Sequence, residues 1–93
     1  MILVSVHDVK AETYTPPHVA QSKAAAIREF EVIVNDKEKK TMIAQHPEDF
    51  SLILVGEWLE RVPVEGQQMK FTARLLGYTE FECLAQGVDL VKE

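Results

Sequence analysis

Cysteine, glycine and long apolar runs are all scarce in this chain, and each scarcity excludes a class of protein. Cys83 is the sole cysteine among 93 residues, so no disulfide can form within the chain, and a reducing compartment is expected. The four glycines stand far apart, which excludes a glycine-rich phosphate loop. No apolar run approaches the ~20 residues that span a membrane, and the opening run of residues 1–6 is too short for a signal-peptide core. We therefore expect a soluble cytoplasmic protein without a membrane partner.

Positive charge is scarce as well. The chain carries ten lysines and arginines against fifteen aspartates and glutamates, which gives a net charge of -5. Such a surface repels phosphate as a whole, so only a local basic patch would allow contact with nucleic acid. The hydrophobic fraction of 46% with 27% charged residues is that of an ordinary globular protein, and we expect residues 1–93 to form one domain.

The chain also lacks a recognisable constellation for catalysis or metal binding. Four side chains could bind zinc, but no two of them stand at the short spacing of a zinc site: His7, His18, His46 and Cys83. The acidic pair at residues 48–49 follows Pro47 directly, where turns carry solvated carboxylates. Cys83 is interpreted as a small half-buried thiol and not as a nucleophile. We therefore expect no enzyme, no catalytic residue, no metal and no cofactor.

Apolar periodicity predicts the elements of an α+β fold. Residues 2–6 alternate as a strand, with Ile2, Val4 and Val6 on one face. Residues 7–15 show a weaker alternation, typical of a second strand or of an extension of the first. Two prolines at residues 16–17 end that pattern and predict a loop, because proline donates no ladder hydrogen bond.

A helix is predicted from about residue 22 to residue 35. Ser22 is the expected N-cap, and the run Lys23–Ala26 strongly favours helix. The expected buried stripe is spaced by three and four residues and consists of Ala26, Ile27, Phe30, Ile33 and Val34. We expect this one principal helix to pack on one face of a small antiparallel or mixed sheet.

The second half of the chain supplies the rest of the sheet. Residues 50–59 form a nearly continuous apolar run that predicts a central strand, with Gly56 at a bulge or close approach. Residues 61–69 contain Pro63 and Gly66 and predict a hairpin or loop. Residues 70–84 fit either a strand or a short helix capped by glycine. From about Gly87 we expect a tail that frays or pairs with a sheet edge.

Several short motifs stand in a fixed order over residues 1–56. They are Asp8–Ala11, Tyr14, Pro17, the helix core Ala25–Phe30 and the turn and strand His46–Gly56. This ordered set resembles the small nonstructural protein of gokushovirus-like microviruses, which are phages with small circular single-stranded DNA genomes. The resemblance implies a non-virion protein of DNA replication or genome packaging in the host cytoplasm, often described as DNA-binding. Its implied partner is single-stranded DNA or a phage or host replication protein. After Gly56 the chain departs from the family pattern.

Basic residues and aromatic residues supply the candidate contacts with nucleic acid. Three lysines cluster just after the predicted helix, where cations also complement the helix dipole, so a solvated helix end is the alternative. A positive strip beside an exposed aromatic would hold phosphates while unpaired bases stack. Trp58 could equally belong to the core, and Arg28 could pair with Asp8 or Glu31. The predicted nucleic-acid-binding residues are Arg28, Lys37, Lys39, Lys40, Lys10, Lys23, Tyr14 and Trp58.

A second hypothesis is a non-enzymatic module for protein interaction. The apolar strand residues exceed what one helix can cover, so a second sheet or a second subunit would cover the remaining face, and we expect a homodimer whichever function holds. Together with the net charge of -5, this predicts a small acidic homodimer that does not bind nucleic acid and docks through a sheet edge or Trp58.

Overall fold

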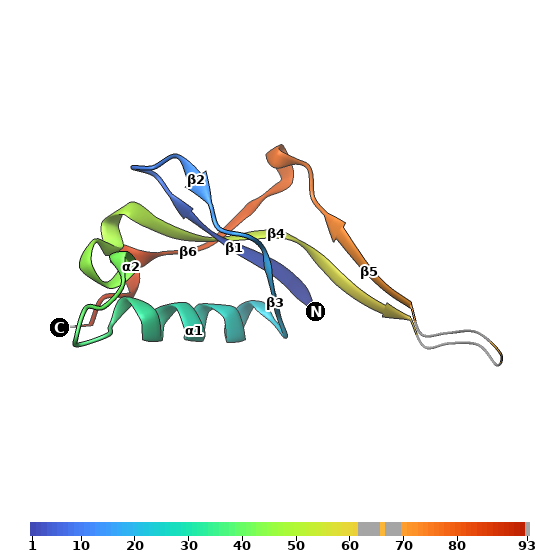
Figure 1. Ribbon diagram of the computed structural model, residues 1–93, viewed down its shortest axis with the longest axis horizontal. Coiled ribbons are helices and arrows are strands. Elements are labelled where there is room, and N and C mark those ends of the chain that lie inside the picture. Colours follow the sequence, from blue (N-terminus) through green and yellow to red (C-terminus); the bar gives the residue numbers. More distant parts are fainter. Residues whose placement is uncertain (62–65, 67–69, 93) are drawn as a thin grey trace.

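The computed structural model of the protein describes residues 1–61, 66 and 70–92. Within them one main helix lies along one face of a six-stranded antiparallel sheet (Figure 1), which confirms the predicted α+β class. The strands are β1 (Ile2–Asp8), β2 (Thr13–Tyr14), β3 (His18–Ala20), β4 (Phe50–Arg61), β5 (Lys70–Leu75) and β6 (Glu82–Gln86). The α-helices are α1 (Lys23–Val34) and the single turn α2 (Met42–Gln45). The 3-10 turns are η1 (Pro47–Asp49), η2 (Tyr78–Glu80) and η3 (Gly87–Leu90).

The sheet has two long central strands and two broken outer rows. β1 pairs with β4 in the middle, β2 and β3 both pair with the outer edge of β1, and β5 and β6 both pair with the other edge of β4. The predicted loop at residues 16–17 is present, but the chain returns to the sheet at His18 and forms β3, which the sequence did not predict. The prolines therefore interrupt the outer row without ending it.

Gly56 lies at both a bulge and a close approach, as predicted. Leu3 pairs with Gly56 and Val4 with Leu54, so Val55 is the extra residue of β4. A Cβ atom on Gly56 would lie 2.4 Å from the carbonyl oxygen of Arg74 on β5. Only glycine allows the two backbones to come this close.

The helix α1 begins at the predicted N-cap and ends close to the predicted residue 35. Ser22 Oγ accepts a hydrogen bond of 3.1 Å from the amide of Ala25, and Asn35 is the C-cap. Three residues at four-residue spacing, Ala26, Phe30 and Val34, are buried. The prediction that Ile33 belongs to this buried stripe is wrong, because its side chain is 38% exposed. At about 100° per residue, Ile27 and Ile33 lie on opposite flanks of the stripe, and only the Ile27 flank packs on the core.

The two faces of the sheet are covered differently. The face toward α1 holds the main core, which consists of Val4, Val6, Ala20, Ala26, Phe30, Val34, Phe50 and Leu52. The opposite face holds a smaller cluster of Leu3, Ile53 and Val55, and Phe81 packs against it. Among the described residues no helix covers this second face (Figure 1), which we call the open face.

The outer half of β4 continues beyond the helix. The 12 residues of α1 span ~18 Å and the 12 residues of β4 span ~40 Å, so α1 lies under only part of the strand (Figure 1). β5 pairs antiparallel with this outer half from Gly56 to Arg61, which confirms the strand alternative for residues 70–75. The predicted turn residue Pro63 lies outside the described residues.

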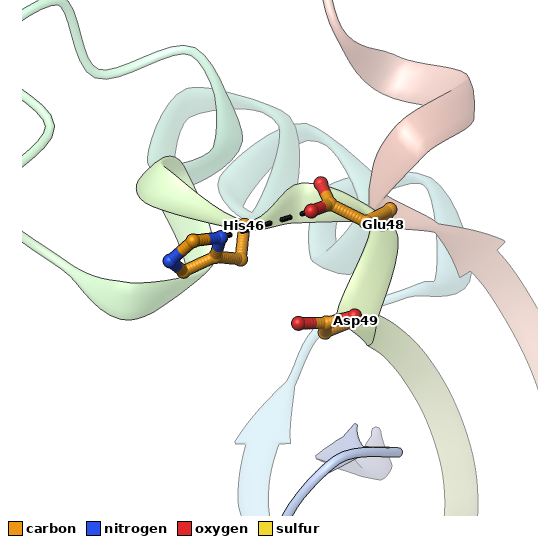
Figure 2. Close-up of side chains that lie close together, drawn as sticks. All are labelled: His46, Glu48 and Asp49. Atoms are coloured by element: carbon orange, nitrogen blue, oxygen red, sulfur yellow. Dashed lines mark ion pairs between the residues drawn. The ribbon is translucent and has the colours of Figure 1, made fainter.

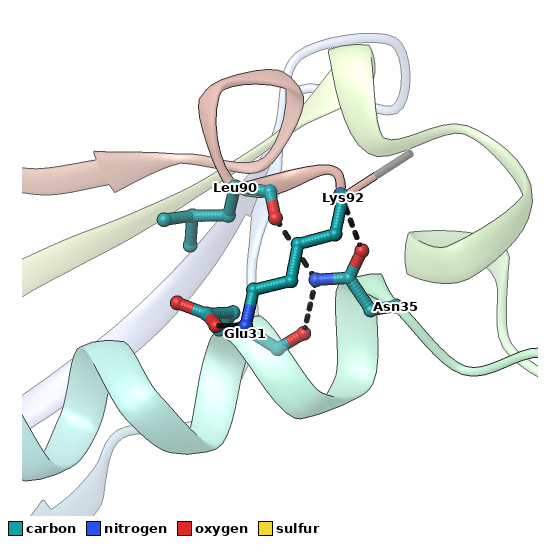
Figure 3. A network of polar contacts seen from close by, with 4 residues as sticks. All are labelled: Glu31, Asn35, Leu90 and Lys92. Carbon is teal, nitrogen blue, oxygen red and sulfur yellow. Dashed lines mark hydrogen bonds and ion pairs between the residues drawn. The ribbon is translucent and has the colours of Figure 1, made fainter.

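Residues 87–92, for which the sequence predicts a tail that frays or pairs with a sheet edge, lie against the end of α1. The side-chain amide of Asn35 donates to the carbonyls of Glu31 and Leu90 at 2.9 Å each, and Asn35 Oδ1 accepts from the amide of Lys92 at 2.7 Å (Figure 3). Lys92 Nζ also pairs with Glu31 at 2.6 Å. One helix cap therefore holds the last described residues in place. In the described part of the chain, no helix combines the length and the apolar character needed to cross a membrane.

Candidate nucleic-acid interface

An apolar groove of about 260 Å³ lies on the open face. On one side of it the chain passes from β2 to β3, and on the other side it passes from β5 to β6. The central strands β1 and β4 form its floor, and the segments around the β2–β3 and β5–β6 connections form its two walls. The lining residues are Ser5 and Val55 on the floor, Tyr14, Thr15 and Pro17 on one wall, and Leu75, Tyr78 and Phe81 on the other. The chain at β2 and the turn between β5 and β6 both lie on the side of the sheet opposite α1 (Figure 1).

The first wall is fixed by hydrogen bonds to β1. Ser5 Oγ donates to the carbonyl of Thr15 at 2.7 Å, and Thr15 Oγ1 accepts from the amide of Val6 at 2.9 Å. Because Tyr14 pairs with His7, its side chain lies on the same face as Ser5 and His7, away from α1. The buried hydroxyl of Ser5 is thus satisfied within the wall.

The second wall is the turn that follows β5. The amide of Leu76 donates to the carbonyl of Val55 at 2.8 Å, which keeps the chain beside the bulge. The amide of Glu80 donates to the carbonyl of Gly77 at 2.8 Å and closes η2. This turn directs Tyr78 and Phe81 toward the groove, and Tyr78 is 75% exposed.

Four rings are in contact across the open face. Tyr14 stacks on His7 with ring centroids 4.5 Å apart, and it meets Phe81 edge to face at 5.8 Å. Tyr78 lies 5.6 Å from Phe81 in a tilted arrangement. Desolvation, and then a hydrogen bond with Tyr78, raise the pKa of Tyr14 above its ordinary value.

None of the described residues that line the groove is charged. The lining residues supply aromatic rings, the proline ring, aliphatic carbons and the hydroxyls of serine, threonine and tyrosine. Such a surface suits a flat, weakly polar group and offers no counter-ion for a phosphate.

The predicted contact residues do not gather in one strip. Tyr14 lines the groove, whereas Trp58 lies half-buried on β4 beyond the bulge and outside the groove lining. Lys23 begins α1 and Lys37 follows its end, about 18 Å away along the helix axis. Arg28 is exposed on α1, on the other side of the sheet from Tyr14.

Ion pairs neutralise part of the predicted basic set. Lys23 pairs with Glu82 at 2.9 Å, and Lys40 pairs with Glu38 at 2.5 Å. In the described part of the chain no ion pair involves the other predicted cations, which are Lys10, Arg28, Lys37 and Lys39. Arg28 pairs with neither of the two carboxylates proposed for it from the sequence.

Two of the unpaired lysines share a hollow at the end of α1. Lys37 and Lys39 line it together with Lys92, which the folded C-terminal segment brings there. The hollow has a volume of about 290 Å³ and is also lined by Asp36. The carboxylate of Asp36 accepts hydrogen bonds from the backbone amides of Glu38 and Lys40. The sequence did not predict Lys92, because its position depends on the Asn35 cap.

A histidine and two carboxylates meet at η1, where the sequence predicts only a turn. The ligand atoms of His46, Glu48 and Asp49 lie within 4.8 Å of one another (Figure 2). His46 Nδ1 lies 3.7 Å from Glu48 Oε1, and the two pair when the imidazole is protonated. His46 and Glu48 are exposed to water, as the turn interpretation of the sequence expects.

Most groove residues were missed by reasoning from the sequence. Only Tyr14 was predicted as a contact, while Pro17, Leu75, Tyr78 and Phe81 were not. The sequence signals that could have indicated the groove are local. Tyr14 stands just before the two prolines at residues 16–17, and Tyr78 and Phe81 follow Gly77 at a spacing of three residues. These segments meet only because β1 and β4 pair at the centre of the sheet.

Comparison with known proteins identifies the chain over most of its length. The family model described as Phage ORF5 protein matches residues 1–64 of the 93. This range includes β1 to β4 and the first wall of the groove, but not the second wall. No curated protein and no solved structure gave a significant match. The protein belongs to the Phage ORF5 protein family.

Proposed function

We propose that this phage protein binds single-stranded DNA during replication or packaging of a phage genome, without catalysing a reaction. The observation that carries the proposal is the groove of aromatic side chains on the open face of the sheet. Family membership supports the phage setting. The resemblance of residues 1–56 to nonstructural microvirus proteins supports a single-stranded genome and action in the host cytoplasm.

Aromatic side chains favour single strands over duplex. An unpaired base exposes its flat face, and stacking on an aromatic ring contributes ~1–3 kcal/mol per base with little dependence on sequence. In a duplex the same faces are already stacked on their neighbours. Tyr78 and Tyr14 are 75% and 39% exposed, so both rings are accessible to a base.

Charge limits the affinity of such a complex. The net charge of -5 repels the phosphate backbone, so the contacts with phosphate fall to local cations. Lys37 and Lys39 are the best placed, because no ion pair in the described residues engages them and Lys92 lies beside them. We expect modest affinity without sequence preference.

A fluorescence anisotropy titration tests the proposal. The probe is a labelled single-stranded oligonucleotide of mixed sequence, titrated at about 50 mM and about 200 mM salt, with the matching duplex as the control. We expect binding to the single strand that weakens at the higher salt, and much weaker binding to the duplex. No binding at the lower salt would rule out the proposed function.

The second candidate function is an acidic homodimer that docks another protein. The observation that favours it is a hollow of about 390 Å³ beside the end of α1, where the apolar Val32 and Ile33 lie together with the polar residues Asn35, Asp36 and Thr41. Val32 is 69% exposed, and nearby Met42 is 59% exposed. Sedimentation at micromolar concentration tests the homodimer that this function requires: a species of twice the monomer mass supports it, and the monomer alone contradicts it.

A further inference from the structure

We propose that the groove on the open face holds one unpaired nucleobase, stacked on Tyr78, by contacts that involve no charge. This inference rests on the proposed function and adds the occupant of the groove and the residue that binds it. The relevant features are the shape of the groove, the rings that remain accessible, the polar groups at its edge and the absence of charge among its described lining residues.

The shape of the groove limits the occupant. Pro17 and Tyr14 stand on one side, Leu75 and Tyr78 on the other, and Val55 closes the bottom. A flat group that lies between these walls would place its faces against carbon atoms. A base pair within a duplex cannot enter, because its faces are stacked on neighbouring pairs and its edges carry two backbones.

The contacts among the rings leave Tyr78 as the accessible platform. Tyr14 is stacked on His7 at 4.5 Å, which covers one of its faces, and Phe81 is half-buried against the cluster around Val55. Tyr78 is 75% exposed, although it lies only 5.6 Å from Phe81. A base stacked on Tyr78 would therefore bury the largest exposed aromatic surface of the groove.

The polar groups at the groove suit the edge of a base. The hydroxyls of Ser5 and Thr15 are engaged with each other and with the backbone, so they do not require a ligand. The hydroxyls of Tyr14 and Tyr78 are hydrogen-bonded to each other, which engages one of their two protons and leaves the other proton and free lone pairs for a base edge. A hydroxyl that both donates and accepts discriminates poorly among bases.

The lack of charge distinguishes this site from an ordinary phosphate-binding groove. No described residue of the lining is charged, and Lys37 and Lys39 stand at the far end of α1 behind the sheet. Stacking in the groove should therefore contribute affinity that does not depend on salt. Any salt dependence of the whole complex should come from lysines outside the groove.

Three variants of the full chain test the proposal against a labelled oligothymidylate. Tyr78→Ala removes the platform, and we expect ~5- to 150-fold weaker binding, which corresponds to one lost base stack, with the salt slope unchanged. Tyr78→Phe keeps the ring and should bind within about two-fold of the wild type. The double change Lys37→Gln and Lys39→Gln should flatten the salt slope. Tyr78 is largely exposed, so its variants should fold, and equal melting temperatures would confirm this.

The outcomes separate this inference from the proposed function. If the wild type binds the oligonucleotide and Tyr78→Ala binds equally well, the groove is not the base site, although the proposed function stands. If an abasic oligonucleotide of the same length competes as well as the oligothymidylate, phosphates alone carry the binding and the inference fails. If the wild type does not bind at all, both fail. A wild-type dimer that Tyr78→Ala converts to monomer would assign the groove to a second copy of the chain and overturn the inference.

Discussion

Replacing Gly56 by alanine tests how the sheet builds the second wall of the groove. The added methyl carbon would lie 2.4 Å from the carbonyl oxygen of Arg74 and 3.2 Å from the Cα atom of Leu75. Both are backbone atoms of the paired strand β5, so neither can rotate away. The chain must either widen the β4–β5 pair by about 1 Å or lose part of its ladder. Leu75 belongs to the wall, so the groove should change with it.

The loss of unfolding free energy in Gly56→Ala follows from the effect of overpacking in other proteins. Forcing one extra carbon into a packed site costs ~1–3 kcal/mol, and a rigid backbone obstacle belongs in the upper half of that range. For a chain of this length each kcal/mol lowers the melting temperature by ~4–8 °C. We therefore expect Gly56→Ala to lower Tm by about 8 to 24 °C.

Gly77→Ala is the matched control for this change. A Cβ atom at Gly77 would meet only Glu80 Oε1 at 3.4 Å, and the residue has φ of -65°, which any amino acid adopts. Thermal unfolding followed by circular dichroism compares the two variants. If Gly56→Ala melts together with Gly77→Ala, the close approach of β4 and β5 is not a constraint and the reasoning is refuted.

Three further predictions concern the core, the cap of α1 and the ring cluster. Phe30→Ala should cost ~3–5 kcal/mol of unfolding free energy, because the ring is 2% exposed in the main core; an unchanged urea midpoint would contradict this. Asn35→Ala removes the bonds to Leu90 and Lys92 and should cost ~1–3 kcal/mol and speed amide exchange at Lys92, while unchanged exchange would argue against the cap. The pKa of Tyr14 is raised in the folded protein, so the unfolded chain loses this proton first, and stability should fall as pH rises above about 10. Tyr14→Phe should lose less stability than the wild type over that pH range. Urea titrations that show equal losses for the two proteins would contradict the expected contribution of Tyr14.

The sequence predicted the elements whose signals are local. The helix α1 has a capping serine and a buried stripe, and the central strand β4 has an apolar run with a glycine, so both were found with their special residues. Ile33 was misplaced because helical periodicity does not reveal which flank of a stripe faces the sheet.

The elements that the sequence missed depend on distant partners. β3 has three residues, and its pairing with Ile2–Val4 cannot be inferred from three residues alone. The fold of residues 87–92 depends on Asn35, which lies 55 residues before Leu90. The groove was missed for the same reason, because its walls are brought together by the β1–β4 pair.

The most direct test of the account is the map of backbone amide shifts when a short single-stranded oligonucleotide is added to isotope-labelled protein. Binding through the open face predicts the largest shifts at Ser5, Tyr14, Thr15 and the segment Leu75–Phe81, with small shifts on the outer side of α1. Shifts confined to Val32–Met42, or no shifts at a saturating concentration, would contradict the claim that this face binds single-stranded DNA.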